Sequence, residues 1–520
     1  MSTVQLNPRE RQLKALLLDV AAYIDKDADN SREPLVLRWA GGWVRDKLLG
    51  IQSHDIDTAI NCMTGFAFAS KMRDFCEIPE NVEKHSIGPT DIGNLHKIAQ
   101  NPEKSKHLET VTTKVFGFDV DFVNLRKETY AEDSRNPQME FGTAQEDALR
   151  RDATVNALFY NLHSGEVEDL TGGLRDMDQK LIRTPMEPFQ TFMDDPLRVL
   201  RLVRFASRLE FSIDPAAEKV MGDERVLNAL RLKISRERVG IELEKMLKGN
   251  HPCAALGLID RLGLYHSIFT DPAHAEMSQP DITNWNEVYS FLDRLEAQRT
   301  PGSIHDTLIK TDEARHFAWN LAAIVPWEQI PDPKPTKPGK PPLPFVTVAA
   351  REGIKAPNRL SDLITAAHKH RSEIVRLRDI VNNKESAMHE RDRFGMAIRE
   401  WDTRGGNWRL QVLYAILFDV LQRAQKGAAS NYTEVLRKWQ EFLDHLQHLD
   451  VLDAPSIKRL VDGRELSKGL GIKPGKWMAA AMEVAMAWQL RNPGVTDPAG
   501  AVEEVRRRKE ELGIDGVLSK

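Results

Sequence analysis

The chain has 520 residues, of which 41% are hydrophobic, and its formal net charge at pH 7 is −5. Such a length can bury a large core and suits several domains, whereas the slightly acidic charge excludes a globally basic nucleic-acid-binding protein, so any RNA contact must come from local patches. The three cysteines, Cys62, Cys76 and Cys253, have no C-x-x-C spacing, which argues against structural zinc or a disulfide scaffold. No apolar run is long enough to span a bilayer, and the start MSTVQLNPRERQ lacks the apolar stretch of a signal peptide, so we expect no membrane partner.

A glycine turn follows the first predicted strand. Residues 35–39 have the pattern of a short strand, Gly41 and Gly42 form a turn that needs close backbone approach, and residues 44–49 open an amphipathic helix. The N–H groups and the positive dipole end at such a helix start favour an anion. Arg45 adds a planar guanidinium that can grip a polyphosphate. We therefore predict that Gly42 and Arg45 bind a nucleotide.

Two carboxylates follow on a predicted strand at 55–60. Alternation with period 2 places Asp55 and Asp57 on one face of this strand. Like charges so close raise each other's pKa unless a cation lies between them, and Mg²⁺ held by carboxylates and substrate phosphates is the usual solution. The alternative is a solvated strand edge beside a glycine turn. The combination of both patterns within residues 41–59 favours the metal site.

A predicted β-hairpin at 110–126 carries two further acids. Asp119 and Asp121 lie on one face of its second strand by the same alternation. Either could supply a third carboxylate to the site. Either could instead be a surface residue of an edge strand, where charge discourages aggregation.

A charged run begins at a predicted helix start marked by Pro196. Asp195, Arg198, Arg201 and Arg204 recur every three residues and share one slowly drifting helix face. Asp195 can accept from the exocyclic amine of cytosine or adenine while Arg198 donates to the neighbouring ring nitrogen. Uracil and guanine would leave buried groups unpaired, at about 1–3 kcal/mol per contact. The alternative is that Asp195 is an ordinary helix N-cap and that the arginines form a solvated face.

In order along the chain, these motifs resemble those of the tRNA nucleotidyltransferase and poly(A) polymerase family, in the class found in bacteria and eukaryotes, within the polymerase-β-like superfamily. The matching segments are GGWVRDKLLG with DID, RRDATVNA at 150–157, DLTGG at 169–173 with IRTP at 182–185, DDPLR at 194–198, and the pair Arg238 and Glu242. Many bacterial members begin the fourth motif with Glu where this chain has Asp194. Five ordered matches argue against a chance resemblance.

The resemblance implies roles for these residues. It makes Asp55, Asp57 and Asp121 catalytic, with Asp55 and Asp57 binding Mg²⁺ as the cofactor; Asp121 is preferred to Asp119 because it aligns better with the acidic position of the family. It assigns ribose recognition to the RRDATVNA motif, a hinge to 169–185, base selection to the DDPLR motif, and helix stabilisation to Arg238 and Glu242. The predicted nucleotide-binding residues are Gly42, Arg45, Arg151, Asp152, Asn156, Asp195, Arg198, Arg201 and Arg204.

The predicted fold class is α+β, with a small mixed β-sheet nucleotidyltransferase head followed by a mostly α-helical neck, body and tail. Strand patterns fade beyond about residue 187, where helical periodicity dominates. The predicted domains are the head at 1–186, the neck at 187–265, the body at 266–400 and the tail at 401–520. The body contains the segment PDPKPTKPGKPPLP at 331–344, with seven prolines in fourteen residues, which predicts a stiff linker or insertion, with an SH3-type ligand as the alternative.

Several segments are candidates for contact with RNA. Lys473, Lys476 and Trp477 lie in KGLGIKPGKW, which resembles the tail segment of the family that holds the body of tRNA. Basic residues at 231–248 and 369–378 are candidate phosphate contacts, with solvated helix faces as an equal alternative. Residues 76–110 correspond to the flexible loop of the family that is implicated in the switch from C to A addition.

The function implied by the resemblance is template-independent addition and repair of the 3′-terminal CCA of tRNA from CTP and ATP, by two-metal nucleotidyl transfer with release of pyrophosphate. The alternatives are a poly(A) polymerase, a partial enzyme that adds only CC or only A, and an RNA-binding protein with a degenerate head. The expected partners are tRNA lacking all or part of the CCA, CTP and ATP. We expect a monomer in the cytoplasm, with nuclear and mitochondrial pools.

Overall fold

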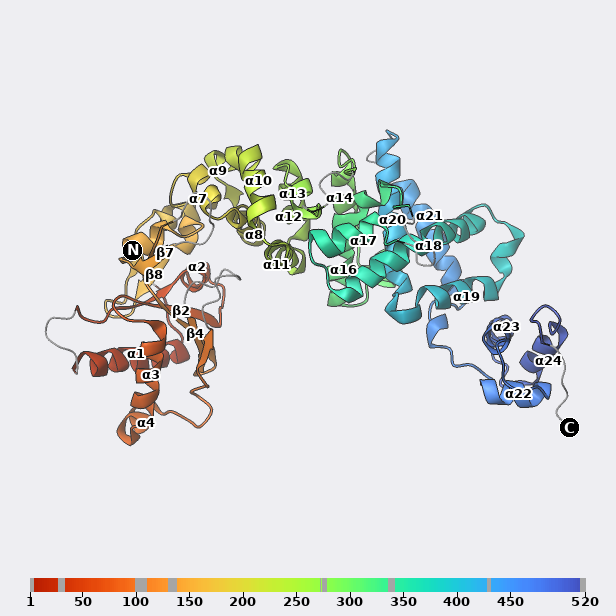
Figure 1. The fold of residues 1–520 in the computed structure, drawn as a ribbon, viewed down its shortest axis with the longest axis horizontal. Helices are drawn as coiled ribbons and strands as arrows, with labels where there is room; N and C mark the ends of the chain where they lie inside the picture. Colours follow the sequence, from red (N-terminus) through yellow and green to blue (C-terminus); the bar gives the residue numbers. More distant parts are fainter. Residues whose placement is uncertain are drawn as a thin grey trace. The chain divides into compact units, whose positions relative to one another are not determined.

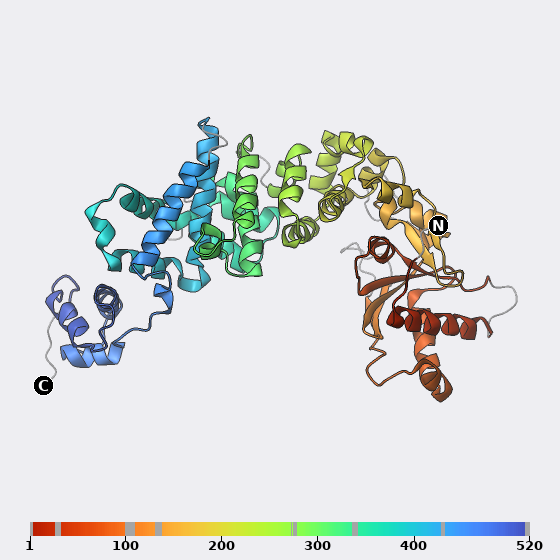
Figure 2. The same cartoon turned by 180° about the vertical axis from the view of Figure 1, so that it is seen from behind.

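A computed structural model of the chain describes residues 4–26, 33–98, 110–129, 138–271, 273, 278–334, 342–427 and 432–514. The chain forms two compact units, Met1–Ser267 and Ile268–Lys520, which Figures 1 and 2 show from opposite sides. Within the described ranges every strand belongs to the first unit, and the second is helical. This confirms the predicted α+β class, whereas the division into head, neck, body and tail stays a prediction. The NPEKSKHLE part of the predicted C-to-A loop and residues 335–341 of the proline-rich segment lie outside the described residues.

A mixed seven-stranded sheet, counted over the described residues, forms the centre of the first unit, in the order β3-β4-β5-β2-β1-β8-β9. Its strands are β1 (Leu37–Ala40), β2 (Asp55–Ile60), β3 (His96–Ile98), β4 (Thr110–Val115), β5 (Phe118–Asn124), β8 (Leu158–Asn161) and β9 (Val167–Asp169). Neighbours pair antiparallel except β2 and β5, which run parallel with Asp57 opposite Asp121. The predicted strand at 55–60 and the hairpin at 110–126 are confirmed.

The first strand begins two residues later than predicted, at Leu37. The N–H of Leu35 donates to the carboxylate of Asp25 at 3.1 Å, and the N–H of Val36 donates to the side chain of Asn61 at 2.8 Å. These two groups therefore bond to side chains instead of entering the strand ladder.

Helices cover one face of the sheet and leave the other open. Phe68 of α3 (Gly65–Cys76) packs against Phe122 of β5, with ring centroids 5.1 Å apart. The helix α1 (Pro8–Lys26) packs against α3 and buries Leu13, Leu16, Leu17 and Val20 at helical spacing. Alternation along β2 and β5 then directs Asp57 and Asp121 to the opposite face. The apolar face forms the core, and the acidic face is free for a site.

Further elements of the first unit surround that acidic face. The helix α2 (Gly42–Leu48) follows β1 and begins two residues earlier than predicted, because Gly41 takes a positive φ of 69° and starts the turn. The others are the ribbon of β6 (Arg126–Thr129) and β7 (Gln138–Phe141), α5 (Ala144–Leu149), α6 (Gly173–Asp178), α7 (Pro188–Asp194), α8 (Leu197–Leu209), α10 (Glu224–Lys233), α11 (Arg236–Lys248) and α12 (Pro252–Arg261). The helix α8 packs against α11 and α12.

The second unit is built around a central helix, α20 (Trp408–Gln425), which buries residues on all sides. It packs against α14 (Trp285–Ala297), α16 (Asp312–Ile324), α18 (Asn358–Asn382) and α21 (Thr433–His448). Toward the C-terminus, α22 (Gly463–Leu470), α23 (Met478–Arg491) and α24 (Ala499–Arg507) enclose a separate hydrophobic cluster that includes Leu466, Ala481 and Val505. Over the described part of the chain, each helix is too short or too polar to cross a membrane.

Candidate active site

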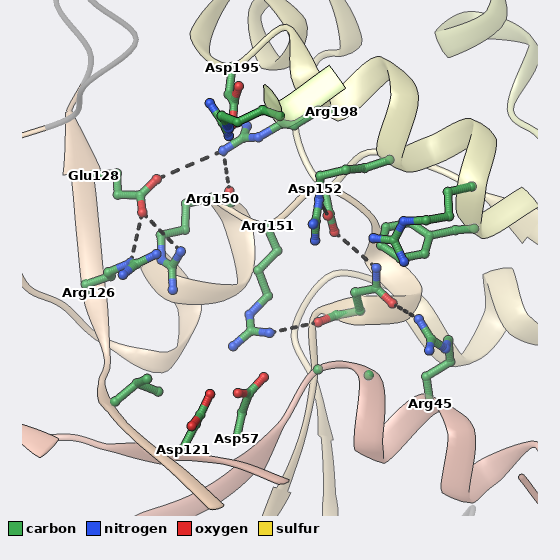
Figure 3. Close-up of a pocket in the computed structure, with 18 of the residues that line it drawn as sticks. Arg45, Asp57, Asp121, Arg126, Glu128, Arg150, Arg151, Asp152, Asp195 and Arg198 are labelled. Carbon is green, nitrogen blue, oxygen red and sulfur yellow. Dashed lines mark hydrogen bonds and ion pairs between the residues drawn. The ribbon is translucent and has the colours of Figure 1, made fainter. Parts of the chain in front are cut away.

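A cavity of about 580 Å³ opens over the acidic face of the sheet (Figure 3). Nine arginines and five carboxylates line it, which leaves an excess of four positive charges. These residues are Arg45, Asp57, Asp121, Arg126, Glu128, Arg150, Arg151, Asp152, Asp195, Arg198, Arg201, Arg204, Arg208 and Arg238. The positive excess suits a polyphosphate, and the carboxylates gather where a cation could join it.

The acidic floor of the cavity consists of Asp57 and Asp121, which lie side by side in Figure 3. Asp55 shares the face of β2 with Asp57 and is exposed, but it lies outside the cavity lining. Asp119 also lies outside the lining, and its carboxylate pairs with Lys114 at 2.8 Å. The structure therefore brings Asp121, and not Asp119, to Asp57.

Both floor carboxylates bind protons more tightly than usual. Burial raises the pKa of Asp57 to about 6; Arg151 opposes this shift, and the charges of Asp121 and Asp55 add to it. The surface of Asp57 is exposed because the cavity is open above it, so the burial reflects the crowded walls of the cavity. Burial also raises the pKa of Asp121, although a 2.5 Å hydrogen bond from the Thr112 hydroxyl opposes the shift. Unneutralised acids of this kind are suited to a divalent cation.

The donor set fits a metal that shares its ligands with a substrate. Among the described residues, no three side chains of Asp, Glu, His or Cys converge closely enough to enclose an ion. Mg²⁺ commonly takes one or two carboxylates and completes its octahedron with water and substrate phosphates. Asp57 and Asp121 would supply those carboxylates, with Asp55 next to them.

We expect divalent-cation binding to weaken as the pH falls below 6. The proton and the cation compete for Asp57, whose pKa of about 6 means that the ionised form prevails only above that pH. One displaced proton corresponds to about a tenfold loss of affinity per pH unit below the pKa. Titration of Mn²⁺ into the protein at pH 5 to 8 measures this dependence. An affinity that does not change over that pH range would contradict the expectation.

The glycine turn lies beside the acidic floor. A Cβ on Gly41 would lie 2.7 Å from Nη1 of Arg151 and 3.8 Å from Oδ2 of Asp57. Gly41 combines this approach with a φ of 69°, so a side chain there is excluded twice. The predicted nucleotide-binding residue Gly42 lies inside α2 and lines the cavity. The turn therefore leaves room for the Arg151 guanidinium close to Asp57.

We expect the Gly41→Ala variant to lose more nucleotide affinity than the Gly50→Ala variant. Both glycines have a positive φ, 69° and 74°, but a Cβ on Gly50 meets nothing within 4 Å. Each substitution costs about 1–2 kcal/mol of backbone strain. Only Gly41→Ala also displaces Arg151. Thermal unfolding and nucleotide binding of the two variants separate these effects, and equal nucleotide affinities would contradict the role of the close approach.

Arg45 is nearly fully buried, and its guanidinium is engaged within the protein. It pairs with Asp46 at 2.6 Å and donates to Oδ1 of Asn156. Burial lowers its pKa, and Asp46 opposes the shift. The predicted grip on phosphate thus remains a prediction, because the structure shows this fork occupied by protein partners.

A chain of polar contacts continues from Asn156 to α8 (Figure 3). The Asn156 amide donates to Asp152 at 3.1 Å, and Nε of Arg201 donates to the other oxygen of Asp152 at 2.5 Å. Burial alone would raise the pKa of Asp152, but Arg201 and Asn156 outweigh it and hold the pKa below the usual range. The predicted ribose motif is therefore linked to the predicted base-reading helix by a partly buried ion pair between Asp152 and Arg201.

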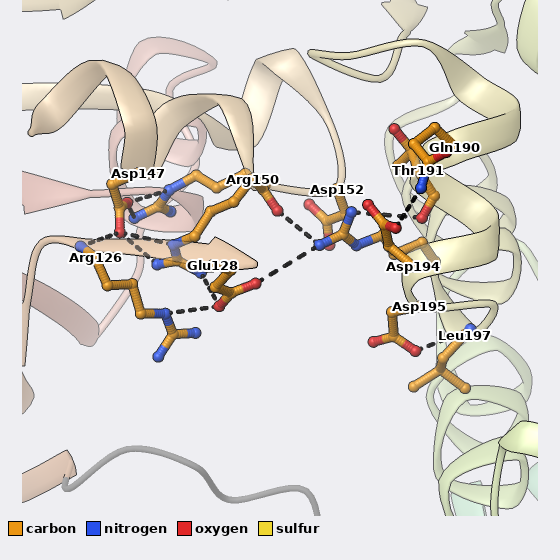
Figure 4. A network of polar contacts seen from close by, with 12 residues as sticks. Arg126, Glu128, Asp147, Arg150, Asp152, Gln190, Thr191, Asp194, Asp195 and Leu197 are labelled. Atoms are coloured by element: carbon orange, nitrogen blue, oxygen red, sulfur yellow. Dashed lines mark hydrogen bonds and ion pairs between the residues drawn. The ribbon is translucent and has the colours of Figure 1, made fainter. Parts of the chain in front are cut away.

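Arg151 connects this motif to the acidic floor. Its Nε donates to Asp147 at 3.0 Å, and its Nη1 donates to the Asn156 carbonyl at 3.0 Å. Asp147 also accepts from Arg150 in the network of Figure 4. Arg151 and Asp57 line the same cavity, and the Arg151 charge opposes the rise in the pKa of Asp57.

Asp195 caps the start of α8 and also lines the cavity, so base reading by this residue stays a prediction. Its Oδ1 accepts from the N–H of Leu197 at 3.2 Å, as a helix cap does, and its Oδ2 accepts from Arg238 at 3.0 Å. It also lines the cavity together with Arg198. Arg198 is 8% exposed and donates to the Arg150 carbonyl at 2.7 Å. Figure 4 shows Asp195 and Leu197 at the start of α8 on one side of this network, with Arg150 and Glu128 on the other.

Arg201 and Arg204 of α8 pair with Glu242 of the predicted fifth motif. Glu242 is 3% exposed and accepts from Nε of Arg204 at 2.6 Å, with Arg201 3.7 Å away. Arg204 also lies over the ring of Phe205, 4.4 Å from its centroid. The helix α11, which carries Arg238 and Glu242, therefore orients the charged face of α8.

Several lining residues were missed from the sequence. Arg208 pairs with the buried Asp46 at 3.0 Å and lies four residues after Arg204, so the helical spacing alone could have revealed it. Arg126, Glu128 and Met139 come from the β6–β7 ribbon, for which no pattern indicated a place at the site.

The predicted RNA contacts of the second unit differ in exposure. Lys473 and Lys476 are exposed, whereas Trp477 is half-buried against the C-terminal cluster and donates from its ring to the Lys473 carbonyl at 3.2 Å. Of the basic residues at 369–378, Arg371 pairs with Glu328 at 2.8 Å and Arg378 with Asp419 at 2.9 Å. Internal pairing of this kind favours a structural role for these two arginines.

Comparison with known proteins places these residues in matched regions. Residues 37–183 match the Poly A polymerase head domain, and residues 210–277 match the probable RNA and SrmB- binding site of polymerase A. The first region contains the glycine turn and the acidic floor, and the second contains Arg238 and Glu242.

Relatives match along nearly the whole chain. Nucleotidyltransferase lcsQ of Purpureocillium lilacinum is 54% identical over 98% of this chain and 93% of the relative. The mitochondrial CCA tRNA nucleotidyltransferase of Saccharomyces cerevisiae is 37% identical over 95% and 92%. The tRNA nucleotidyltransferase cca1 of Schizosaccharomyces pombe is 34% identical over 95% of both chains.

Solved structures share the fold. Thermotoga maritima CCA-adding enzyme complexed with tRNA-CCA aligns over 96% of both chains with a TM-score of 0.61 and 18% identity. Bacillus stearothermophilus CCA-adding enzyme in complex with CTP aligns over 97% of this chain and 100% of that one, with a TM-score of 0.56 and 20% identity.

Proposed function

The chain belongs to the tRNA nucleotidyltransferase and poly(A) polymerase family, and we propose that it builds and repairs the 3′-terminal CCA of tRNA from CTP and ATP, without a nucleic-acid template. The RNA 3′-hydroxyl attacks the α-phosphorus, a new phosphodiester forms, and pyrophosphate leaves. One observation carries this proposal: the acidic pair Asp57 and Asp121 and the base-reading pair Asp195 and Arg198 line one cavity with a net positive charge.

The side chains suit the parts of this reaction. Arg151, held above Gly41, would orient the triphosphate, and Asp152 and Asn156 would lie beside the ribose. Asp195 and Arg198 would read the edge shared by cytosine and adenine. Divalent cations held by Asp57 and Asp121, Mg²⁺ in our proposal, would neutralise the triphosphate and lower the pKa of the RNA hydroxyl.

The network around Asp195 supports base selection by the protein itself. Arg238 and the Leu197 N–H fix both oxygens of the carboxylate, and the Arg150 carbonyl fixes Arg198. A preorganised pair of this kind loses little entropy on binding and rejects a base that leaves one partner unsatisfied. No template strand is required for such a choice.

The relatives named as tRNA nucleotidyltransferases support tRNA as the RNA substrate, and the mitochondrial name of the Saccharomyces cerevisiae relative supports a mitochondrial pool. We propose a cytoplasmic pool beside it. For the tail we propose that the exposed Lys473 and Lys476 contact phosphates of the tRNA body.

An incorporation assay tests the proposal. The protein receives Mg²⁺, tRNA ending before the CCA, and each labelled nucleotide singly and then CTP with ATP together. We expect addition of two C residues followed by one A, with little UTP or GTP used. Long A tails without C would instead identify a poly(A) polymerase, and arrest after CC would identify a partial enzyme. Absence of any transfer to a correctly folded tRNA would refute the proposal.

A further inference from the structure

One face of the β6–β7 ribbon lines the cavity and continues past its edge. In its register Arg126 lies opposite Phe141 and Glu128 opposite Met139, and directly opposed residues of antiparallel strands share a face. Arg126, Glu128 and Met139 line the cavity. Phe141, the fourth member of this face, lies outside the lining and is 55% exposed. An aromatic surface therefore extends the site at its edge.

The backbone holds Phe141 in a fixed position. A Cβ on the next residue, Gly142, would lie 2.6 Å from the carbonyl carbon of Arg126, so the two segments are in close contact. The Gly142 N–H donates to the Leu125 carbonyl at 3.1 Å, and Thr143 then caps α5. The exposed ring of Phe141 is therefore carried by a backbone that its neighbours hold in place beside the cavity.

We propose that Phe141 stacks against a base at the single-stranded 3′ end of the RNA substrate and so helps to direct its terminal hydroxyl to Asp121. This inference rests on the proposed function. During addition of C, C and A the terminal base of the acceptor changes, so its contact must accept any base. An aromatic face does so, because every base has a π-face, whereas a hydrogen-bonding reader would discriminate.

The surroundings of Phe141 complement an RNA end. Arg126 lies opposite Phe141 in the ribbon, and the neighbouring Lys127 has a side chain that is 54% exposed. Arg126 pairs with Glu128 at 2.8 Å, and Lys127 lies on the opposite face of the ribbon, 3.6 Å from Glu146. Of the two, Lys127 is the more exposed and can meet a phosphate of the RNA. The lining of the cavity continues from Asp121 through Val123 of β5 to Arg126. The 3′ end of an RNA over Phe141 therefore has a continuous route to the acidic floor.

Kinetics with tRNA that lacks only its terminal A tests this surface. Stacking of one base corresponds to roughly 5- to 150-fold in affinity, so we expect Phe141→Ala to raise KM for the RNA about tenfold or more. KM for ATP should change less than about twofold, and Phe141→Trp should restore the RNA affinity. Phe66→Ala is the matched control, because Phe66 is the other strongly exposed aromatic residue in the described ranges, at 38%, and lies outside the cavity. An unchanged KM for RNA in Phe141→Ala would overturn the inference.

Two further measurements separate this inference from the proposed function. RNA with an abasic 3′-terminal nucleotide should bind wild type and Phe141→Ala equally, since the stacking partner is gone; a persisting difference would indicate a structural effect and overturn the proposal. The fluorescence of an RNA that ends in 2-aminopurine should be quenched more by the wild type than by Phe141→Ala. This binding signal needs no turnover, so it judges the stacking surface even if the protein transfers no nucleotide.

Discussion

We expect the Asp57→Asn variant to lose nucleotide transfer by about a thousandfold or more while binding tRNA as the wild type does. Asn keeps the size of the side chain but removes the charge that the cation requires, and metal assistance is worth several kcal/mol in reactions of this class. Asp57 lies on the cavity floor opposite Asp121 and is the one residue of β2 that lines the cavity. Single-turnover incorporation of CMP measures the loss, and filter binding measures tRNA affinity.

Stability distinguishes a chemical defect from unfolding in this variant. The pKa of Asp57 in the fold, about 6, lies above its ordinary value, so ionisation of this carboxylate destabilises the fold, and the effect develops as the pH rises through 6. Without divalent cations at pH 8, Asp57→Asn should therefore unfold at a temperature no lower than that of the wild type. Asp119→Asn is the matched control, because Asp119 belongs to the same sheet but pairs with Lys114 outside the cavity. Full activity of Asp57→Asn would refute the metal assignment.

The second large effect is expected for Asp195→Asn, which should shift the nucleotide preference from CTP toward UTP rather than abolish transfer. The amide oxygen can still accept from the Leu197 N–H, so the start of α8 is kept. Its N–H₂ group, however, replaces Oδ2 and loses the hydrogen bond from Arg238; it faces the exocyclic amine of cytosine with a second donor and offers a donor to the O4 of uracil. At about 1–3 kcal/mol per contact, kcat/KM for CTP should fall about 10- to 100-fold while use of UTP rises.

Incorporation of each of the four nucleotides by Asp195→Asn measures this exchange. Asp223→Asn is the control for capping, since Asp223 accepts from the Arg225 N–H at 2.9 Å at the start of α10, away from the cavity. An equal loss for all four nucleotides, accompanied by reduced helicity, would favour the view that Asp195 serves only as a cap.

The local pattern of the sequence was sufficient for the strands and for part of the site. Period-2 alternation predicted that Asp55 and Asp57 share a face, and β2 begins and ends at the predicted residues. Helical spacing likewise predicted one face for Arg198, Arg201 and Arg204, all of which line the cavity. Such predictions succeed because they depend only on the geometry of one strand or one helix.

Pairings between distant segments were beyond local pattern. The choice between Asp119 and Asp121 depends on the register of β5 against β2. Likewise, Arg45 bonds to Asn156 as well as to Asp46 only because residue 156 approaches α2 in the fold. The β6–β7 ribbon, with Glu128 and Phe141, enters the site through tertiary contacts that leave no periodic signal.

By itself, then, the sequence determined the class of fold, the family and the candidate residues of the site, because motif spacing and periodicity are properties of the chain itself. Only the tertiary structure decided which of the charged side chains line one cavity and which form ion pairs within the protein. It also placed an exposed aromatic residue at the edge of the cavity. The physical reason is that burial and ion pairing depend on distances between segments far apart in the chain, and these distances exist only after the sheet and helices have packed.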